Sequence, residues 1–288
     1  MQNVKLFIDL TRLNRPIGYM LLFWPCLWGL ALAYDFNEDI NLFLFYSFLF
    51  FAGSVLMRSA GCIVNDIVDR NFDKSVERTK NRPIASGKIS VSIASIYVII
   101  LCSFAFLVLI NFNYLTIILA MASMPLAFTY PLMKRFTYWP QLFLGVTFNY
   151  GLILGWSSVQ ENLSLAPIIF YLGAIFWTLG YDTIYGYQDI KDDEIIGVKS
   201  TSIKFKNSPK KILYLCYSIT ILSLILVGFY MKFNLYYFLS IIIITFHLFI
   251  LQISKLNIKK PDICLGIFKS NNLLGLLIFL NIMIGKLI

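Results

Sequence analysis

Two groups of acidic residues in this 288-residue chain have the types and spacing that metal chemistry requires. In the first group, Asn65, Asp69 and Asp73 are four residues apart, so they would share one face of a continuing helix. Like charges at this spacing destabilise an isolated helix, so the row needs a compensating cation. Oxygen ligands select Mg²⁺ or Ca²⁺, and Mg²⁺ typically bridges one or two carboxylates to substrate phosphates. The first group therefore predicts a metal and phosphate site.

The second group follows the same logic 120 residues later, counted from Asp69 to Asp189. Asp182, Tyr185, Asp189 and Asp193 stand at i, i+3, i+7 and i+11, again one face of a helix. Solvated loops that obey only topology rules would explain the bases nearby, but not two acidic rows. We predict that the rows meet across a cavity and hold Mg²⁺ against a diphosphate. Whether the two groups reflect an internal duplication is left open.

Basic residues near the acidic groups are candidates for binding the remaining phosphate oxygens. Arg58 is a separate case, because it lies two helical turns deeper than Asn65 on the same face. A charge inside a membrane span costs at least about 2.5–3.5 kcal/mol, so Arg58 should face a cavity and have a partner. Two interpretations stay open for it, a pairing with a neighbouring helix and an anchor for an anionic acceptor. The candidate phosphate-binding bases are Arg70, Arg78, Lys80, Arg82, Lys134, Arg135 and Lys199.

The elements that position these residues are apolar runs long enough to cross a bilayer. The chain is 59% hydrophobic and 14% charged, whereas a soluble domain is about a quarter charged. Backbone groups in lipid must be satisfied internally, so each run should be a helix. We predict an all-α integral membrane bundle of about nine transmembrane helices around a central cavity, a single domain over 1–288. The runs are 17–34, 41–62, 90–110, 114–132, 138–156, 164–181, 212–231, 235–253 and 270–287.

The distribution of basic residues predicts how the bundle is oriented. With nine spans, 21 of the 24 Lys and Arg residues fall on one side, which indicates a cytoplasmic N-terminus. The long connections 63–89 and 182–211 are then both cytoplasmic and functional. This placement explains the net charge of +9 without nucleic acid, and no feature indicates an obligatory protein partner or a cleavable signal peptide. His247 lies inside an apolar run, which favours a packing role.

Five blocks in order resemble the intramembrane aromatic prenyltransferases, the UbiA family, over almost the whole chain. The first and fourth blocks look like the branch that acts on 4-hydroxybenzoate in ubiquinone biosynthesis. The resemblance implies a membrane enzyme whose site faces the cytoplasm. We expect the membrane to be a bacterial inner membrane. The blocks are LNRPIGYMLLFWPCLWGL at 13–30, MRSAGCIVNDIVDRNFD at 57–73, RTKNRPIASGKIS at 78–90, TYPLMKRFTYWPQLFLG at 129–145 and GYDTIYGYQDIKDDEIIGVKST at 180–201.

The resemblance also implies roles for single residues. Asn65 and four catalytic aspartates, Asp69, Asp73, Asp189 and Asp193, would coordinate Mg²⁺ and the diphosphate. The family's Tyr-x-x-x-Lys element appears as 130–134 and places Lys134 at a phosphate, and Arg135 would bind diphosphate or the acceptor carboxylate. The predicted substrate-binding residues are Asn65, Asp66, Arg58, Arg82, Tyr130, Lys134, Arg135, Asp182, Tyr185 and Lys199.

The implied reaction transfers a polyprenyl group from polyprenyl diphosphate to the ring carbon ortho to the hydroxyl of 4-hydroxybenzoate. The ring proton would go to diphosphate or to an acid such as Asp182. Membrane lipid would surround the prenyl tail. The alternatives are a relative with a different acceptor and a transporter with cytoplasmic metal sites. A CDP-alcohol transferase is disfavoured, because its motif Asp-Gly-x-x-Ala-Arg is not found.

Overall fold

The structure is a computed structural model that describes residues 2–77 and 79–287, and within these ranges it contains helices and no strand. The predicted all-α class is confirmed. The helices are α1 (Gln2–Thr11), α2 (Ile17–Ala33), α3 (Ile40–Asp73), α4 (Val91–Leu109), α5 (Tyr114–Thr129), η1 (Tyr130–Leu132), α6 (Met133–Phe136), α7 (Pro140–Gln160), α8 (Leu165–Gly186), α9 (Ile190–Ile196), α10 (Thr201–Lys204), α11 (Pro209–Tyr230), α12 (Leu235–Phe246), η2 (His247–Ser254) and α13 (Pro261–Leu287).

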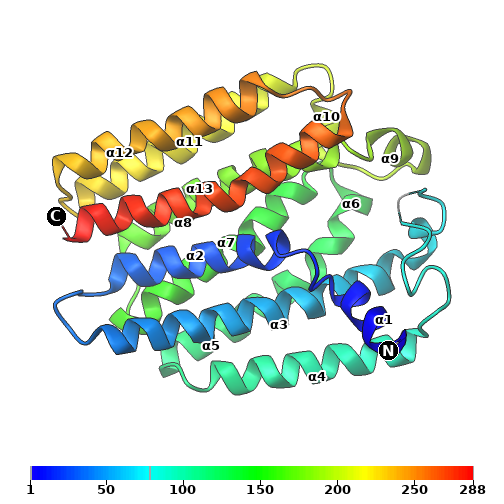
Figure 1. The fold of residues 1–288 in the computed structure, drawn as a ribbon, viewed down its shortest axis with the longest axis horizontal. Coiled ribbons are helices and arrows are strands. Elements are labelled where there is room, and N and C mark those ends of the chain that lie inside the picture. Colours follow the sequence, from blue (N-terminus) through cyan, green and yellow to red (C-terminus); the bar gives the residue numbers. More distant parts are fainter. Residues whose placement is uncertain (1, 78, 288) are drawn as a thin grey trace.

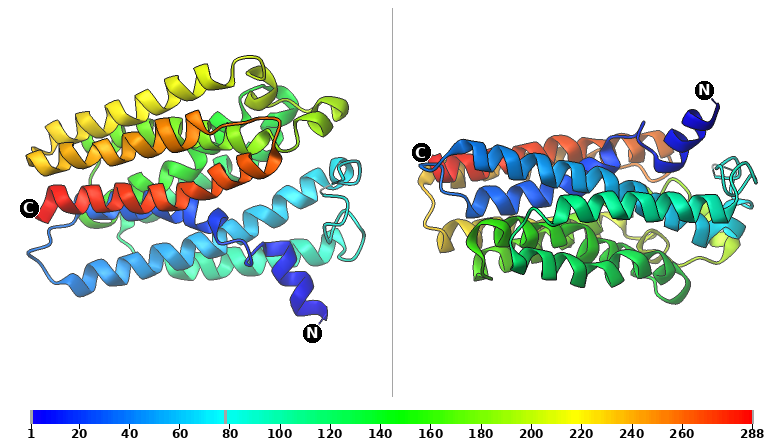
Figure 2. Two further views of the ribbon diagram at one scale, coloured as in Figure 1. Left: turned by 45° about the horizontal axis from the view of Figure 1, so that its top comes forward. Right: turned by 90° about the horizontal axis from the view of Figure 1, so that it is seen from below.

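Each predicted apolar run corresponds to one helix or to consecutive helices, and these run side by side along one axis (Figures 1 and 2). In the described part, eight helical stretches are long and apolar enough to cross a membrane, with α5, η1 and α6 counted as one stretch and α12 and η2 as another. The remaining run is α2, a shorter apolar helix of 17 residues. The two chain ends lie at opposite ends of the bundle, as an odd number of crossings requires (Figure 1). The count of nine spans and the cytoplasmic N-terminus stay predictions.

Helix α2 is short but occupies the middle of the bundle. Twelve of its 17 residues are buried, which is typical of a helix that is apolar on all sides. It packs on α7 through glycines that let the two backbones touch. A Cβ added to Gly155 would lie 2.1 Å from the Cys26 carbonyl oxygen, and one added to Gly29 would lie 2.0 Å from that of Leu152. Small residues at such crossings are what membrane helix packing uses.

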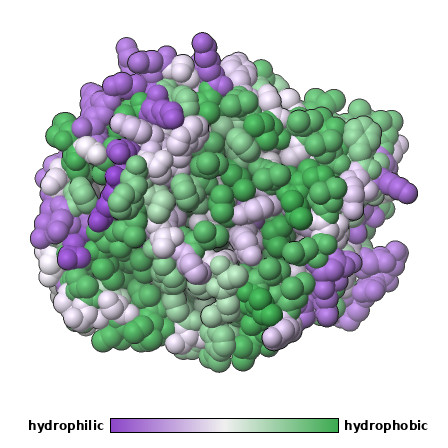
Figure 3. Space-filling view, turned by 180° about the vertical axis from the view of Figure 1, so that it is seen from behind, coloured by the Kyte–Doolittle hydropathy of each residue, from purple (hydrophilic) through white to green (hydrophobic). Residues whose placement is uncertain are grey.

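The outer surface of the bundle is apolar in the middle and hydrophilic toward its ends (Figure 3). Large apolar side chains on this surface, such as Ile99 on α4 and Ile242 on α12, are more than 60% exposed. In a soluble protein they would be a liability, whereas in lipid they are the expected exterior. The bundle is therefore built for a membrane, and its chemistry is concentrated at one end.

Two predicted connections contain more helix than expected. Helix α3 continues to Asp73, so the first eleven residues of the 63–89 connection extend the second apolar run. Helix α13 begins at Pro261, where a proline suits the first turn, and so takes up much of the predicted loop before 270. His247 opens the π-helical segment η2 and is buried, with Nδ1 3.3 Å from Gln252 Nε2. Its surroundings agree with the predicted packing role.

Candidate active site

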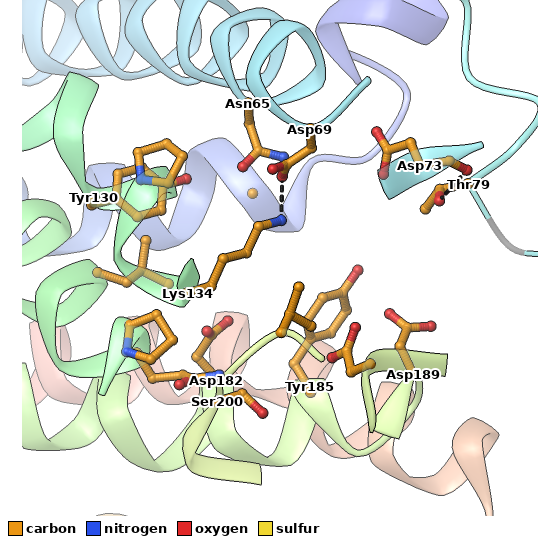
Figure 4. Close-up of a pocket in the computed structure, with 18 of the residues that line it drawn as sticks. Asn65, Asp69, Asp73, Thr79, Tyr130, Lys134, Asp182, Tyr185, Asp189 and Ser200 are labelled. Carbon is orange, nitrogen blue, oxygen red and sulfur yellow. Dashed lines mark hydrogen bonds and ion pairs between the residues drawn. The ribbon is translucent and has the colours of Figure 1, made fainter. Parts of the chain in front are cut away.

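A cavity of about 340 Å³ lies between α3, α6 and α8 at the end of the bundle that carries α1 and α9. Residues of both acidic groups line this cavity. The two rows face each other across the cavity, and Lys134 lies between them (Figure 4). Of the fourteen predicted site residues, all but Asp66 and Arg135 line this cavity. The twelve are Arg58, Asn65, Asp69, Asp73, Arg82, Tyr130, Lys134, Asp182, Tyr185, Asp189, Asp193 and Lys199.

The first row is held by one continuous helix, as its spacing predicts. Asn65, Asp69 and Asp73 all belong to α3, and both aspartates are buried, Asp69 to 1% and Asp73 to 7% exposure. Burying a carboxylate is costly unless it is paired. Lys134 forms an ion pair with Asp69, and Arg82 Nη1 donates to the two Asp73 carboxylate oxygens at 2.9 and 3.1 Å. The row is therefore fixed before any substrate binds.

One oxygen of this row is left without a hydrogen bond. Asp69 Oδ1 is buried and has no hydrogen-bond partner among the described residues, and Arg135 Nη2 lies 3.9 Å from it. An orphaned, buried carboxylate oxygen in a cavity wall is the kind of donor that a hard divalent cation takes. The described residues contain no ready cluster of three or more Asp, Glu, His or Cys for a metal. Mg²⁺ does not need one, because it binds one or two carboxylates together with substrate phosphates.

The second row does not lie on one continuous helix. The spacing predicted such a helix over 182–193, and this prediction is wrong. Helix α8 ends at Gly186, and α9 begins only at Ile190. A Cβ on Gly186 would lie 2.3 Å from Ser202 Oγ, so α10 packs where that side chain is missing. Asp189 precedes α9 with φ −111° and ψ 8°, outside the helical region. Despite this break, the four residues of the row line the same cavity.

Lys134 reaches the cavity from a turn between helices. Helix α5 ends at Thr129, and the short η1 and α6 bring Tyr130 and Lys134 to the cavity wall. The carbonyl of Lys134 accepts a hydrogen bond of 2.8 Å from the backbone N–H of Lys199. The Tyr-x-x-x-Lys element is thereby attached to the segment that follows the second acidic row. Arg135 does not line the cavity; it donates to the Val68 carbonyl at 2.9 Å and lies over the Phe72 ring.

Asp66 also lies outside this cavity, because neighbouring residues of α3 point to different sides. It is 1% exposed and forms ion pairs with Arg12 and with Arg82, the latter at 3.0 Å. Burial alone lowers the pKa of the Arg12 guanidinium, but Cys62 and Asp66 beside it outweigh this effect and raise the pKa overall. Arg12 is therefore charged at any physiological pH. Asp66 holds two arginines at the cavity edge, where both line the wall.

Arg58 lies deep in α3 and lines the cavity floor. Its guanidinium carbon is 5.4 Å from the centre of the Phe148 ring, and a Cβ on Gly18 would come within 2.8 Å of Arg58 Nε. No ion pair joins Arg58 to an acid in ranges 2–77 and 79–287. Pairing with a neighbouring helix therefore takes the form of this contact with Phe148 of α7 and not of an ion pair. The anchor for an anionic acceptor stays a prediction.

An apolar cavity of about 330 Å³ adjoins the polar one. The two share Arg58, Tyr130 and Phe148 as lining residues. Elsewhere the second cavity is lined by side chains such as Phe50, Phe106 and Met124, from α3, α4 and α5. A molecule with a charged head and a long hydrocarbon tail would find matching surroundings for each part.

Sequence reasoning missed several polar residues of the cavity wall. Arg12 and Arg15 were counted only among the Lys and Arg residues that predict the orientation. Their position just before the first apolar run could have indicated that they line the site. Gln141 and Ser200 gave no such signal. Gln141 Oε1 accepts from the Thr201 backbone N–H at 3.0 Å, a contact 60 residues apart. Arg78, predicted to bind phosphate, lies outside the described residues.

Comparison with known proteins gives consistent results. A family model described as the UbiA prenyltransferase family matches residues 22–273. The chain is 42% identical over 285 residues to the mitochondrial 4-hydroxybenzoate polyprenyltransferase of Drosophila pseudoobscura pseudoobscura, covering 99% of this chain and 71% of the relative. It is 44% identical over 283 residues to that of Bos taurus, covering 98% and 75%. A UbiA homolog from Archaeoglobus fulgidus, solved with GPP and Mg²⁺, has the same fold, with TM-score 0.70, 18% identity and coverage of 98% and 100%.

Proposed function

The chain belongs to the UbiA prenyltransferase family, and from this premise we propose that it is a 4-hydroxybenzoate polyprenyltransferase. It transfers a polyprenyl group from polyprenyl diphosphate to the ring carbon ortho to the hydroxyl of 4-hydroxybenzoate and releases diphosphate, a step of ubiquinone biosynthesis. The observation that carries the proposal is the meeting of both acidic rows in one cavity that adjoins an apolar one. The names of the insect relative and the cattle relative support 4-hydroxybenzoate as the acceptor.

The donor would lie across the boundary between the two cavities. Its diphosphate faces the basic side chains of the polar cavity, Arg82, Lys134 and Lys199, while its tail follows the apolar cavity toward lipid. Asn65, Asp69, Asp73, Asp189 and Asp193 would hold Mg²⁺, and the orphaned Asp69 Oδ1 supports this assignment. When bound, Mg²⁺ supplies charge neutralisation for the departing diphosphate.

The chain's own residues then shape the reaction of the two substrates. Arg58 would bind the acceptor carboxylate at the cavity floor, which orients the ring toward the donor carbon. As the bond to diphosphate breaks, positive charge develops on the allylic carbon, and the rings of Tyr130 and Phe148 attract it through their faces. The ring carbon attacks, and its proton leaves for diphosphate or for Asp182, which lines the same cavity.

The chain is an integral membrane protein by family and by its helices. The expectation of a bacterial inner membrane finds no support in the relatives, whose names assign them to mitochondria. We propose the bacterial inner membrane or its mitochondrial counterpart, with the polar cavity on the side rich in Lys and Arg. Protease accessibility of the 63–89 connection in sealed membranes of known orientation checks this placement.

The test is an assay of the purified protein in detergent. The protein is incubated with Mg²⁺, prenyl diphosphates of several lengths and several aromatic acids, and products are identified by mass. We expect a prenylated 4-hydroxybenzoate that forms only with Mg²⁺ or a similar divalent ion. A product from another acceptor alone would reassign the substrate. Uptake into liposomes without any product would replace the enzyme by a transporter.

A further inference from the structure

A second polar cavity of about 940 Å³ lies beside the candidate active site, and no predicted function uses it as a site. Its walls come from the N-terminal segment, residues 81–88, the end of α8 and the first half of α13. Five cationic side chains and only two acidic ones, Asp9 and Asp66, line it. The cations are Arg12, Arg15, Arg82, Lys88 and Lys269.

The excess of positive charge that a ligand would meet in this cavity is larger than the count of five cations against two acids suggests. The buried Asp66 is already engaged by Arg12 and Arg82. Asp9 is then the acid that remains against three cations, Arg15, Lys88 and Lys269. A cleft lined by one sign of charge raises the local concentration of the opposite ion and its rate of association. The cavity is therefore suited to a small anion from water.

The wall shared with the active-site cavity is aromatic. Tyr185 and Phe268 line both cavities, and their ring centres are 4.4 Å apart with an interplanar angle of 41°. Arg12 and Arg82 also line both. An inorganic phosphate would use the cations but would gain nothing from the rings. A planar ring that carries a carboxylate would use both, because aromatic faces pack on one another while the acid meets a base.

The active-site cavity thus has an apolar neighbour on one side and a basic, aromatic neighbour on the other. We propose that the second cavity is a capture site for the aromatic carboxylate acceptor, which is bound there from water before its ring passes Tyr185 and Phe268. This inference rests on the proposed function and adds the acceptor's route to it. Lys88 and Lys269 line the capture site but not the active-site cavity, so they can be changed without altering the active-site wall.

The binding test uses the double variant Lys88→Gln with Lys269→Gln. Its probes are benzoate and benzamide, which lack the hydroxyl that activates the ring carbon for prenylation. Isothermal titration of the full chain in detergent should show the Kd for benzoate raised about fivefold, the effect of losing two exposed charge interactions. The Kd for neutral benzamide should change less than twofold. The matched control is Lys255→Gln with Lys259→Gln, two exposed lysines that do not line the cavity.

The kinetic test separates this inference from the proposed function. In the Lys88 and Lys269 variant, kcat/KM for the aromatic acid should fall about fivefold and lose most of its salt dependence, while that for the prenyl diphosphate stays within twofold. Equal effects on both substrates, or a benzoate Kd equal to the control's, would overturn the capture site while transferase activity stands. A wild-type protein that forms no product would instead defeat the proposed function, and the titration would still decide whether the cavity binds the acid.

Discussion

The two acidic segments reach one cavity by different constructions. The first is the end of a 34-residue helix, and its aspartates are buried and fixed by Arg82 and Lys134. The second is a helix end, a turn and a seven-residue helix, and Asp189 and Asp193 are only half-buried. The comparison teaches that the first wall is buried and held by ion pairs from outside its own helix, whereas the second wall is more exposed to water, and exposed segments open locally at lower cost.

The largest expected effect tests whether both walls serve one reaction. Asp69→Asn and Asp189→Asn should each lower kcat/KM by about 1000-fold, because preorganised charge near a departing group supplies much of catalysis. Product formation by purified variants measures this, with membrane insertion checked by fractionation. A variant at either position that kept a tenth of wild-type activity would remove that wall from the chemistry, and the comparison would then be between an active site and a scaffold.

A smaller effect concerns how firmly the first wall is built. Asp66→Asn leaves Arg12 without its buried partner and removes one of the two that Arg82 has, and breaking a buried pair destabilises a protein by about 3 kcal/mol. Thermal unfolding in detergent should therefore begin at a clearly lower temperature. If Asp66→Asn unfolds like the wild type, the first wall does not depend on this network.

The next prediction separates the substrates that the two walls contact. Arg58→Ala should raise the KM of the aromatic acid about tenfold, the effect of one lost charged hydrogen bond, and that of the donor much less. Lys199→Ala should do the reverse, because it lies beside the second row with the diphosphate. Initial rates with each substrate varied in turn measure both. Equal shifts in the KM values of donor and acceptor would show that neither residue contacts one substrate in preference to the other.

The smallest effect is expected on the exposed face of the second segment. Glu194 pairs with Lys206 at 2.6 Å, but both side chains are more than a third exposed. Such pairs contribute about 0–1 kcal/mol, so Glu194→Gln should leave the unfolding temperature within a few degrees of wild type. A loss as large as that of Asp66→Asn would mean that the second segment is as tightly fixed as the first.

The spacing of residues predicts the construction of the first wall, but for the second wall it predicts the residues that line the cavity and not the break in the helix. The four-residue spacing of Asn65, Asp69 and Asp73 is a property of a helix, and α3 continues through it. At the break after Gly186, Ser202 packs against that glycine, a contact that no local pattern contains. The same holds for Asp66, whose partner Arg12 is 54 residues away. Local periodicity fixes which residues face one way, but distant partners decide what each one meets.

The hydrogen bond from the Lys199 backbone to the Lys134 carbonyl has a consequence for how ligands influence one another. Lys134 pairs with Asp69 of the first row, and Lys199 follows the second row, so this bond connects the two sides of the cavity through the main chain. Energetic coupling between two binding events is reciprocal. A cation that strengthens the binding of the diphosphate must therefore itself bind more strongly when the diphosphate is present. Cooperative binding of donor and cation would then depend in part on the peptide backbone, which side-chain substitution leaves in place.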